Sequence, residues 1–257
     1  MIQHLPRELL LLIFAYLARD VGTLRAAALT CHTVLPVAHE YLFAVIGCRA
    51  LAQDDMVRFF PLVIQLRILP AEARALRQGG FMPRLHPNRF PKLNSITFLS
   101  PPGAADLSLV GPGCFEVLSR LASANITTLT LSSSMFLNLK HVQSFICALP
   151  FLSFLSIRRI TYITPVARRG DSLLLLNGVP DAGRMPSSPA LSHLCFEPEV
   201  VSVATSEVVT WLGNGPSYKT LKSLIIPPAS ITPQAILRHF GPSVIHLALP
   251  LRTLESE

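Results

Sequence analysis

The side chains of this 257-residue chain that could carry catalysis or bind a metal ion are spread along it without a recognisable pattern. The eight histidines include no H-x-x-x-H pair, the spacing that puts two imidazoles on one face of a helix. The fifteen acidic residues form no obvious pair for general acid–base catalysis, and the G-x-S-x-G nucleophile motif is absent. We therefore expect no catalytic residues, no metal site and no cofactor, and thus a protein that is not an enzyme.

One segment and one cysteine could suggest a phosphate-binding loop and a nucleophile, but the neighbouring residues do not support either site. The stretch GNGPSYK, residues 213–219, looks like a phosphate-binding loop, but its spacing differs from G-x-x-x-x-G-K-[ST] and Pro216 lacks an N–H donor. Cys31 follows an apolar helical pattern, which favours a buried thiol over a nucleophile. The five cysteines are an odd number without a C-x-x-C pair, which predicts a reducing compartment, the cytoplasm or the nucleus.

The composition is typical of a folded chain with frequent breaks. Half of the residues are apolar, only 14% are charged and 22 are proline, which indicates one elongated domain or two small ones. The net charge of +7 would suit a nucleic acid only if it were clustered with aromatic residues. The densest basic run consists of Arg67, Arg74, Arg77, Arg84, Arg89 and Lys92. No aromatic residues interleave with it at stacking positions, so we expect a solvated basic face and no nucleic-acid partner.

The chain begins MIQHLPRELLLLIFAYLARD, in which residues 9–18 are all apolar. Ten such residues are too few to cross a bilayer, which needs about 20 in a helix. A secretory signal is also excluded, because Glu8 cancels the charge of Arg7 and no small-x-small cleavage site follows. We therefore expect no membrane insertion.

A short amphipathic helix explains this stretch better. Pro6 suits the first helical position, and Glu8 places an acid in the first turn. Apolar residues recur every four positions on one side, with two more on the adjacent stripe: Leu5, Leu9, Ile13 and Leu17, then Leu10 and Phe14. Such a wide apolar surface predicts two buried faces, one inside the domain and one against a partner.

Two further helices are expected before residue 46. Asp20 opens the second, VGTLRAAALTCHTV, and Pro36 opens the third. The segments LPRELLLLIFAYL and LRAAALTCHTVLPVAHEYLF together resemble the F-box, whose pattern is L-P-x-E-(I/L)-x3-I-x3-L followed by a helix ending in Cys and an aromatic residue. The chain looks most like the variant common in fungi. The resemblance implies a three-helix adaptor-binding domain at residues 1–46.

The resemblance also implies which residues contact the adaptor: Leu5, Pro6, Leu9, Ile13, Leu17, Leu24, Cys31 and Val34. The chain departs from the family at Val34, where a Trp is usual, and this predicts weaker adaptor binding that Val34→Trp would strengthen. The alternative is a small helical bundle whose leucine spacing coincides with the F-box pattern.

The remaining residues, 47–257, repeat the pattern apolar-x-x-apolar-x-apolar about every 30 positions. Seven copies occur, at Val63/Leu66/Ile68, Leu93/Ile96/Phe98, Ile126/Leu129/Leu131, Leu152/Leu155/Ile157, Leu191/Leu194/Phe196, Leu221/Leu224/Ile226 and Val244/Leu247/Leu249. Helix-like pieces lie between them, at residues 114–123, 141–150, 206–215 and 232–241, the last two with caps at Ser206 and Thr232.

This alternation of strand and helix resembles an irregular leucine-rich repeat, and it predicts the fold class α/β: a three-helix F-box followed by a repeat solenoid of parallel strands with helices on the convex side. The alternative is an α/β domain with crossover helices. Ile163 to Pro189 fits the repeat poorly and is expected to be an insertion. We also expect the natural chain or its relatives to extend beyond Glu257, because no polar end cap is visible.

The resemblance implies a substrate receptor of a cullin-based (SCF) ubiquitin ligase, which acts in ubiquitin-dependent protein degradation with the F-box adaptor and the cullin scaffold as partners. The alternatives are a repeat scaffold without ligase coupling and, less favoured, an α/β hydrolase. Residues between the apolar positions of each strand are expected on the concave face, where a target would bind. They are Arg67, Thr97, Thr130, Phe154, Ser156, Arg158, His193, Glu197 and His246, with Phe154 and Arg158 as the expected anchors.

Overall fold

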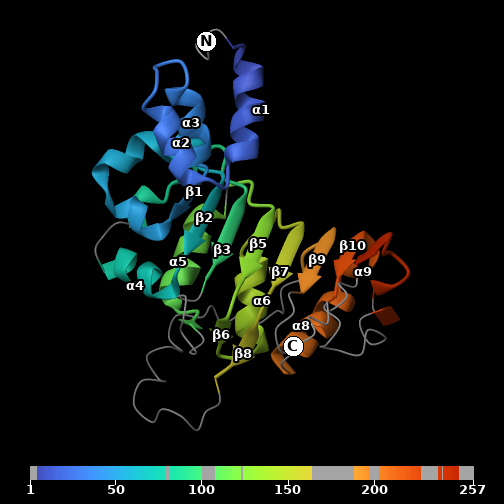
Figure 1. Cartoon of the computed structure of the whole chain (residues 1–257). Helices are drawn as coiled ribbons and strands as arrows, with labels where there is room; N and C mark the ends of the chain where they lie inside the picture. Colours follow the sequence, from blue (N-terminus) through green and yellow to red (C-terminus); the bar gives the residue numbers. More distant parts are fainter. Residues whose placement is uncertain are drawn as a thin grey trace, which may run out of the picture.

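A computed structural model of the chain describes residues 5–78, 82–99, 108–122, 124–163, 188–196, 203–226, 237–238 and 240–248. It shows an α/β fold in which a small helical head precedes a larger body built on a parallel sheet (Figure 1). The expected α/β class is confirmed. Residues 164–187 of the expected insertion, the concave residue Glu197, most of the helix expected at residues 232–241 and the last nine residues lie outside the described residues.

The head contains the three helices that the sequence predicts. They are α1 (Arg7–Leu17), α2 (Val21–Ala28) and α3 (Leu35–Leu42). Asp20 caps α2, because its carboxylate accepts a hydrogen bond from the Thr23 N–H at 3.0 Å. Pro6 lies one position earlier than expected, at the N-cap of α1.

Within the described residues, eight strands form the main sheet. They are β1 (Val45–Gly47), β2 (Gln65–Ile68), β3 (Ser95–Phe98), β5 (Thr128–Leu131), β7 (Phe154–Ile157), β9 (His193–Phe196), β10 (Ser223–Ile225) and β11 (His246–Ala248). They lie side by side in chain order, and every neighbouring pair is parallel. The seven strands expected from the repeated pattern are confirmed, and β1 is an eighth that the pattern does not reveal.

The apolar positions of the repeat lie in register across the sheet. One row begins Leu66, Ile96, Leu129, Leu155, Leu194 and Leu224, and a second contains Ile68, Phe98, Leu131, Ile157 and Phe196. All of these side chains are buried. The first row ends at Leu247 of β11, which is 42% exposed. The expectation that the pattern residues face the core therefore holds up to this last strand.

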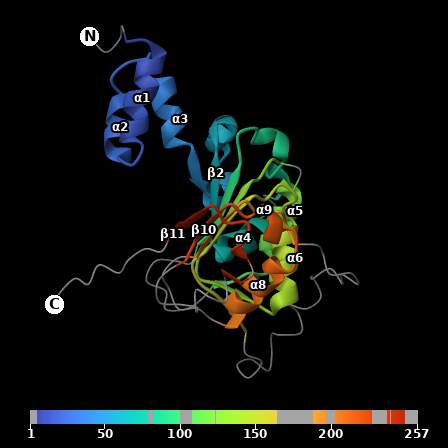
Figure 2. The same cartoon turned by 90° about the vertical axis from the view of Figure 1, so that its right-hand side faces the viewer.

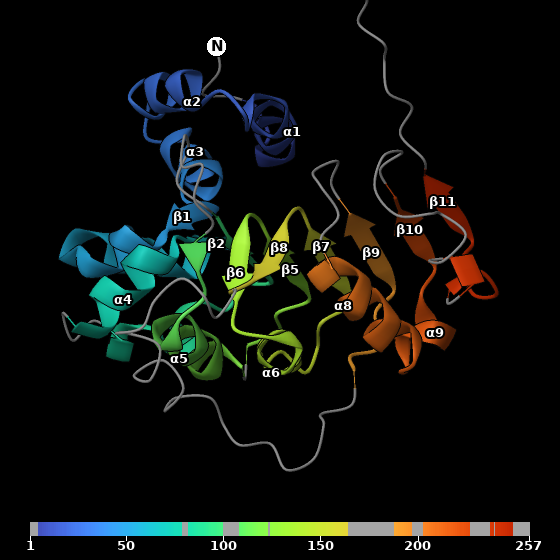
Figure 3. The ribbon, with the colours of Figure 1, turned by 90° about the horizontal axis from the view of Figure 1, so that it is seen from below.

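Helices cover one face of the main sheet and leave the other uncovered (Figures 2 and 3). The body contains α4 (Pro70–Gln78), α5 (Pro112–Leu121), α6 (Leu139–Cys147), α8 (Val203–Gly213) and α9 (Ser217–Thr220), with the 3-10 helices η2 (Cys48–Ala52), η3 (Asp54–Leu62), η4 (Met82–Arg84) and η5 (Pro87–Arg89). Seen from below, the sheet curves gently, with its uncovered face inside the curve (Figure 3).

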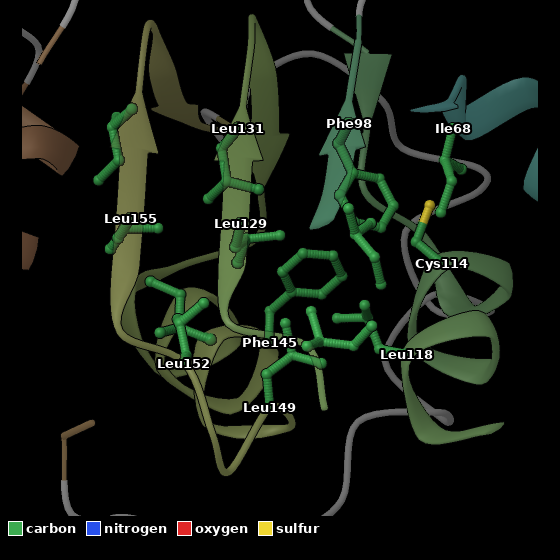
Figure 4. Close-up of a cluster of buried hydrophobic side chains, with 14 of the residues drawn as sticks. Ile68, Phe98, Cys114, Leu118, Leu129, Leu131, Phe145, Leu149, Leu152 and Leu155 are labelled. Carbon is green, nitrogen blue, oxygen red and sulfur yellow. The ribbon is translucent and has the colours of Figure 1, made fainter. Parts of the chain in front are cut away.

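The core fills the space between the apolar rows and the helices. Phe145 of α6 and Leu118 of α5 point toward the strands, and the rings of Phe98 and Phe145 pack edge to face with centroids 4.9 Å apart (Figure 4). Each aromatic side chain of this size buries about 150–250 Å² of surface, so these contacts dominate the stability of the body.

A second, three-stranded parallel sheet lies below the main sheet in the view of Figure 1, next to α6 and α8. It consists of β4 (Ser108–Leu109), β6 (Ser134–Phe136) and β8 (Ile160–Tyr162). The sequence analysis missed these strands because segments of two or three residues are too short to show a period. It also placed the start of α8 at Ser206, whereas the helix begins at Val203; the expected stop at Gly213 is confirmed.

The start of α6 contains a buried histidine with a perturbed pKa. Asn138 caps the helix by accepting the His141 N–H, and the His141 Nδ1 accepts the Leu137 N–H at 3.1 Å. The imidazole is 4% exposed and stacks on Phe115 with ring centroids 4.7 Å apart. Burial lowers the pKa of His141 from 6.5 to about 4, because the charged form loses hydration.

We predict that His141 makes the fold sensitive to acid. Because the native pKa lies below the unfolded one, the unfolded state takes up the proton first as the pH falls from 6.5 to 4. The free energy of unfolding should therefore fall by about 3 kcal/mol over this window, on top of other titrations. Urea unfolding of the wild type and of His141→Asn, which keeps an acceptor but does not titrate, measures the difference. Equal pH slopes for the two proteins would contradict the assignment.

Candidate functional site

Helix α1 has one side buried in the head and one side exposed to solvent. Leu10 and Phe14 are each 4% exposed and pack against Leu24, Val34 and Val37 of the head core. The opposite side carries large apolar residues open to solvent: Leu9 and Ile13 at 45%, Leu12 at 68% and Tyr16 at 92% exposure. These four residues form the α1 apolar face.

Polar contacts with α3 fix this orientation of α1. The Tyr41 hydroxyl donates to the carbonyl of Leu11 at 2.8 Å, and the Arg7 guanidinium pairs with Glu40 at 2.7 Å. The exposed ion pair contributes little free energy, about 1 kcal/mol or less, but the Tyr41 bond is partly shielded. Helix α1 therefore cannot roll its apolar face inward without losing these contacts and exposing Phe14.

The expected adaptor-contact residues divide into two groups. Leu9, Ile13 and Pro6 are exposed, while Leu5, Leu17 and Cys31 are half-buried against the head core. The Cys31 thiol lies 3.1 Å from the Thr33 hydroxyl, and this hydrogen bond lowers the pKa of the thiol. Sequence reasoning did not select Leu12 and Tyr16, although Leu12 lies three residues after Leu9 and Tyr16 three residues after Ile13, which places them on the same face.

Leu24 and Val34 require a correction. They are 0% and 1% exposed, so neither can touch a partner in this conformation. Val34 sits at the N-cap of α3 within the packed interior, where the smaller side chain is already fully enclosed. The expected gain in adaptor binding from an aromatic residue here does not follow, because the residue supports the head instead of presenting a surface.

We predict that Val34→Trp destabilises the head. Overfilling a packed core costs about 1–3 kcal/mol, and indole is far larger than the isopropyl group it would replace. Thermal unfolding followed by circular dichroism should show a lower midpoint, whereas Val34→Ile should change it little. An unchanged or higher midpoint for Val34→Trp would mean that the head has room for the larger ring.

The second candidate surface is the uncovered face of the main sheet. Strand register sets its outward positions in two rows: Val45, Gln65, Ser95, Thr128, Phe154, His193, Ser223 and His246 in one, and Gly47, Arg67, Thr97, Thr130, Ser156, Cys195, Ile225 and Ala248 in the other. Ser and Thr are the most frequent residues in these rows. Across β3, β5, β7 and β9 the surface is therefore mostly polar around one aromatic pair, in which the Phe154 and His193 rings stack with centroids 5.9 Å apart.

The structure brings five expected target-binding residues together on this face or at its rim. Arg67, His193 and Arg158 are exposed, and Thr130 and Phe154 are half-buried. Arg158 follows the end of β7, where its backbone N–H donates to the Leu131 carbonyl at 2.9 Å.

Two other residues expected on the concave face are not available to a partner. Thr97 is 6% exposed and Ser156 is 5% exposed. The Gln65 side-chain amide donates to the Thr97 hydroxyl at 2.6 Å, so the longer neighbour covers the shorter one. His246 of β11 is exposed, as expected.

A pocket of about 400 Å³ lies on the helix-covered side of the body. Its lining includes Leu139 of α6 and Glu207 and Trp211 of α8. Elsewhere among the described residues, no group of three or more His, Cys, Asp or Glu side chains is placed to bind a metal ion. In the same ranges, no helix is long and apolar enough to cross a membrane.

Comparison with known proteins does not assign the chain to a family. No protein-family model matches the chain, and no curated protein is significantly similar to it.

The head is joined to the body through an aromatic cluster. Phe43, just after α3, stacks on Phe59 of η3 with ring centroids 3.8 Å apart and an interplanar angle of 14°. The His39 ring packs edge-on against both, and the Arg58 guanidinium lies 4.7 Å from the Phe59 centroid.

The backbone also links the head to the main sheet. The Ala44 carbonyl accepts hydrogen bonds from the N–H of Ile64, just before β2, and from the N–H of Gln65, the first residue of β2. Because β1 starts at Val45 and pairs with β2, we place the boundary near residue 44 rather than at 46.

Proposed function

We propose that the chain is a substrate receptor of a cullin-based ubiquitin ligase. In this proposal the head is an F-box whose α1 apolar face binds the adaptor, and the uncovered face of the main sheet binds a target protein. The receptor performs no chemistry and contributes proximity, because it holds the target near the ubiquitin-charged enzyme. The proposed place of action is the cytoplasm or the nucleus.

The observation that carries the proposal is the α1 apolar face. Leu9, Leu12 and Ile13 expose large apolar side chains on a helix whose other side is already packed. A contiguous exposed apolar patch on a small domain marks an interaction site. Its sequence, LPRELLLLIFAYL, is also the stretch that resembles the F-box. Exposure and motif therefore fall on the same helix.

The order of the strands supports a leucine-rich-repeat-like body. Parallel strands follow one another in chain order, and the helices lie on one side of the main sheet (Figure 3). A doubly wound α/β domain reverses its strand order and carries helices on both faces. Repeating strand–helix units stacked in one direction give the observed order instead.

We predict that Ile13→Asp abolishes adaptor binding. An apolar anchor at an interface centre contributes about 2 kcal/mol or more, and a buried unpaired carboxylate adds a further cost, so affinity should fall at least about 30-fold. Titration calorimetry with a purified fungal F-box adaptor measures this change. The variant should remain folded, because Ile13 is 45% exposed.

The matched control is Phe151→Asp. Phe151 is an apolar residue of the body that is 54% exposed, and it lies before β7, away from the head. It should bind the adaptor like the wild type. A folded Ile13→Asp variant with wild-type affinity would remove the F-box assignment, and a wild type that binds no adaptor would leave the repeat scaffold without ligase coupling.

A further inference from the structure

Charge is distributed unequally between the strands and the helices of this molecule. None of the described strands of the main sheet contains Asp or Glu, whereas they carry Arg67, His193 and His246. The acidic residues that the structure describes lie in helices or cap them: Glu8, Asp20, Glu40, Asp54, Asp55, Glu72, Glu116 and Glu207. The uncovered face therefore presents cations without fixed anions among the described strands.

Four arginines of the helices pair with carboxylates, whereas the arginine of β2 pairs with none that the structure describes. Arg7, Arg49, Arg84 and Arg120 each lie within 3.2 Å of a carboxylate. Arg67, by contrast, is exposed on β2, the second strand of the main sheet, and makes no ion pair with any residue that the structure describes. Lys222, immediately before β10, is also exposed. Arg67 on the face and Lys222 at the edge where β10 begins are thus exposed to a negatively charged partner.

Between these two cations lies the aromatic pair. Phe154 belongs to β7 and His193 to the neighbouring β9, and the two rings stack at an interplanar angle of 26°. The pair offers a flat, partly apolar platform within a field of Ser and Thr hydroxyls. Aromatic side chains of this kind are common anchors at protein interfaces.

Strand spacing sets the dimensions of a matching ligand. Neighbouring strands lie about 4.8 Å apart, so Arg67 in β2 is about 14 Å across the sheet from Phe154, three strands away. Lys222 is about 10 Å beyond Phe154, two strands further. An extended chain rises about 3.3 Å per residue. In an extended segment that crosses the sheet with an apolar residue at Phe154, the acid that reaches Arg67 would therefore lie about four residues from that apolar residue. The acid that reaches Lys222 would lie about three residues from it in the opposite direction.

We propose that the uncovered face of the main sheet binds an extended acidic segment of the target protein. Its central apolar or aromatic side chain packs on the Phe154–His193 pair, and carboxylates on either side approach Arg67 and Lys222. The inference rests on the proposed function only in taking the occupant to be the target. Charge complementarity selects this occupant, and the half-buried hydroxyls of Ser95, Thr128, Thr130 and Ser223 supply donors for carboxylate and backbone oxygens.

The probe is a phage library of random twelve-residue peptides, selected on the full chain. We expect enriched sequences that carry acids on both sides of an apolar residue. The best selected peptide, labelled with fluorescein, should bind at micromolar Kd in anisotropy titrations. Its affinity should fall at least five-fold when NaCl rises from 50 to 500 mM and when Gln replaces its acids.

Variants locate the site. Arg67→Glu and Lys222→Glu should each weaken the peptide at least ten-fold, and Phe154→Ala at least five-fold. Lys140→Glu, an exposed residue of α6 on the covered side, makes the same change of charge and should leave affinity unchanged. Three results would overturn the proposal. The library could enrich uncharged or basic peptides, or Lys140→Glu could lower peptide affinity as much as Arg67→Glu does. A labelled U12 RNA could also bind more tightly than any peptide.

Adaptor calorimetry on the same proteins separates the two proposals. Arg67→Glu should bind the adaptor like the wild type, because the α1 apolar face lies on the head. Loss of acidic selectivity with normal adaptor binding overturns the target class alone. A wild type that selects acidic peptides but binds no adaptor overturns the ligase role alone.

Discussion

The structure depends on one constraint, the burial of two apolar rows that run across the main sheet. No single strand–helix unit can shield its own Leu and Ile side chains, so each relies on the next unit in register. Phe145 and Leu118 close the rows from the helix side (Figure 4). Since side chains alternate along a strand, fixing these residues inward also fixes Arg67, Phe154 and His193 outward. The candidate target surface is therefore a direct consequence of how the core is packed.

The head applies the same logic to one helix. Leu10 and Phe14 fill the interior, and the Tyr41–Leu11 hydrogen bond fixes the rotation of α1. The remaining apolar positions then have no place inside. A helix that needed only its own domain would carry polar residues there, as surface helices usually do. The sequence instead retains Leu12, Ile13 and Tyr16, which is physically reasonable if a partner covers them.

Sequence reasoning predicted what depends on periodicity and missed what depends on contact. Strands β2 to β11 of the main sheet follow from a pattern that repeats every 30 residues or so, and α1 follows from its apolar stripe. The three strands of the second sheet are too short for a period, and β1 lacks the repeated pattern. The burial of Val34 and of Thr97 could not be read from the sequence, because each depends on neighbours distant in the chain: the packed head core for one and the Gln65 amide for the other.

The junction between head and body decides whether two binding surfaces can act as one receptor. Proximity accelerates a transfer only when the held group stays within reach of the reacting one, so a loose tether would lose much of the effect. Here Phe43 stacks on Phe59, and His39 and Arg58 enclose the pair. Burial and the nearby Arg58 charge lower the pKa of His39, which favours the neutral form of the ring. The head stands on the side of the uncovered sheet face in two perpendicular views (Figures 2 and 3). A target on that face would consequently lie on the same side of the molecule as the helix proposed to bind the ligase, held there by ring stacking instead of by a flexible linker.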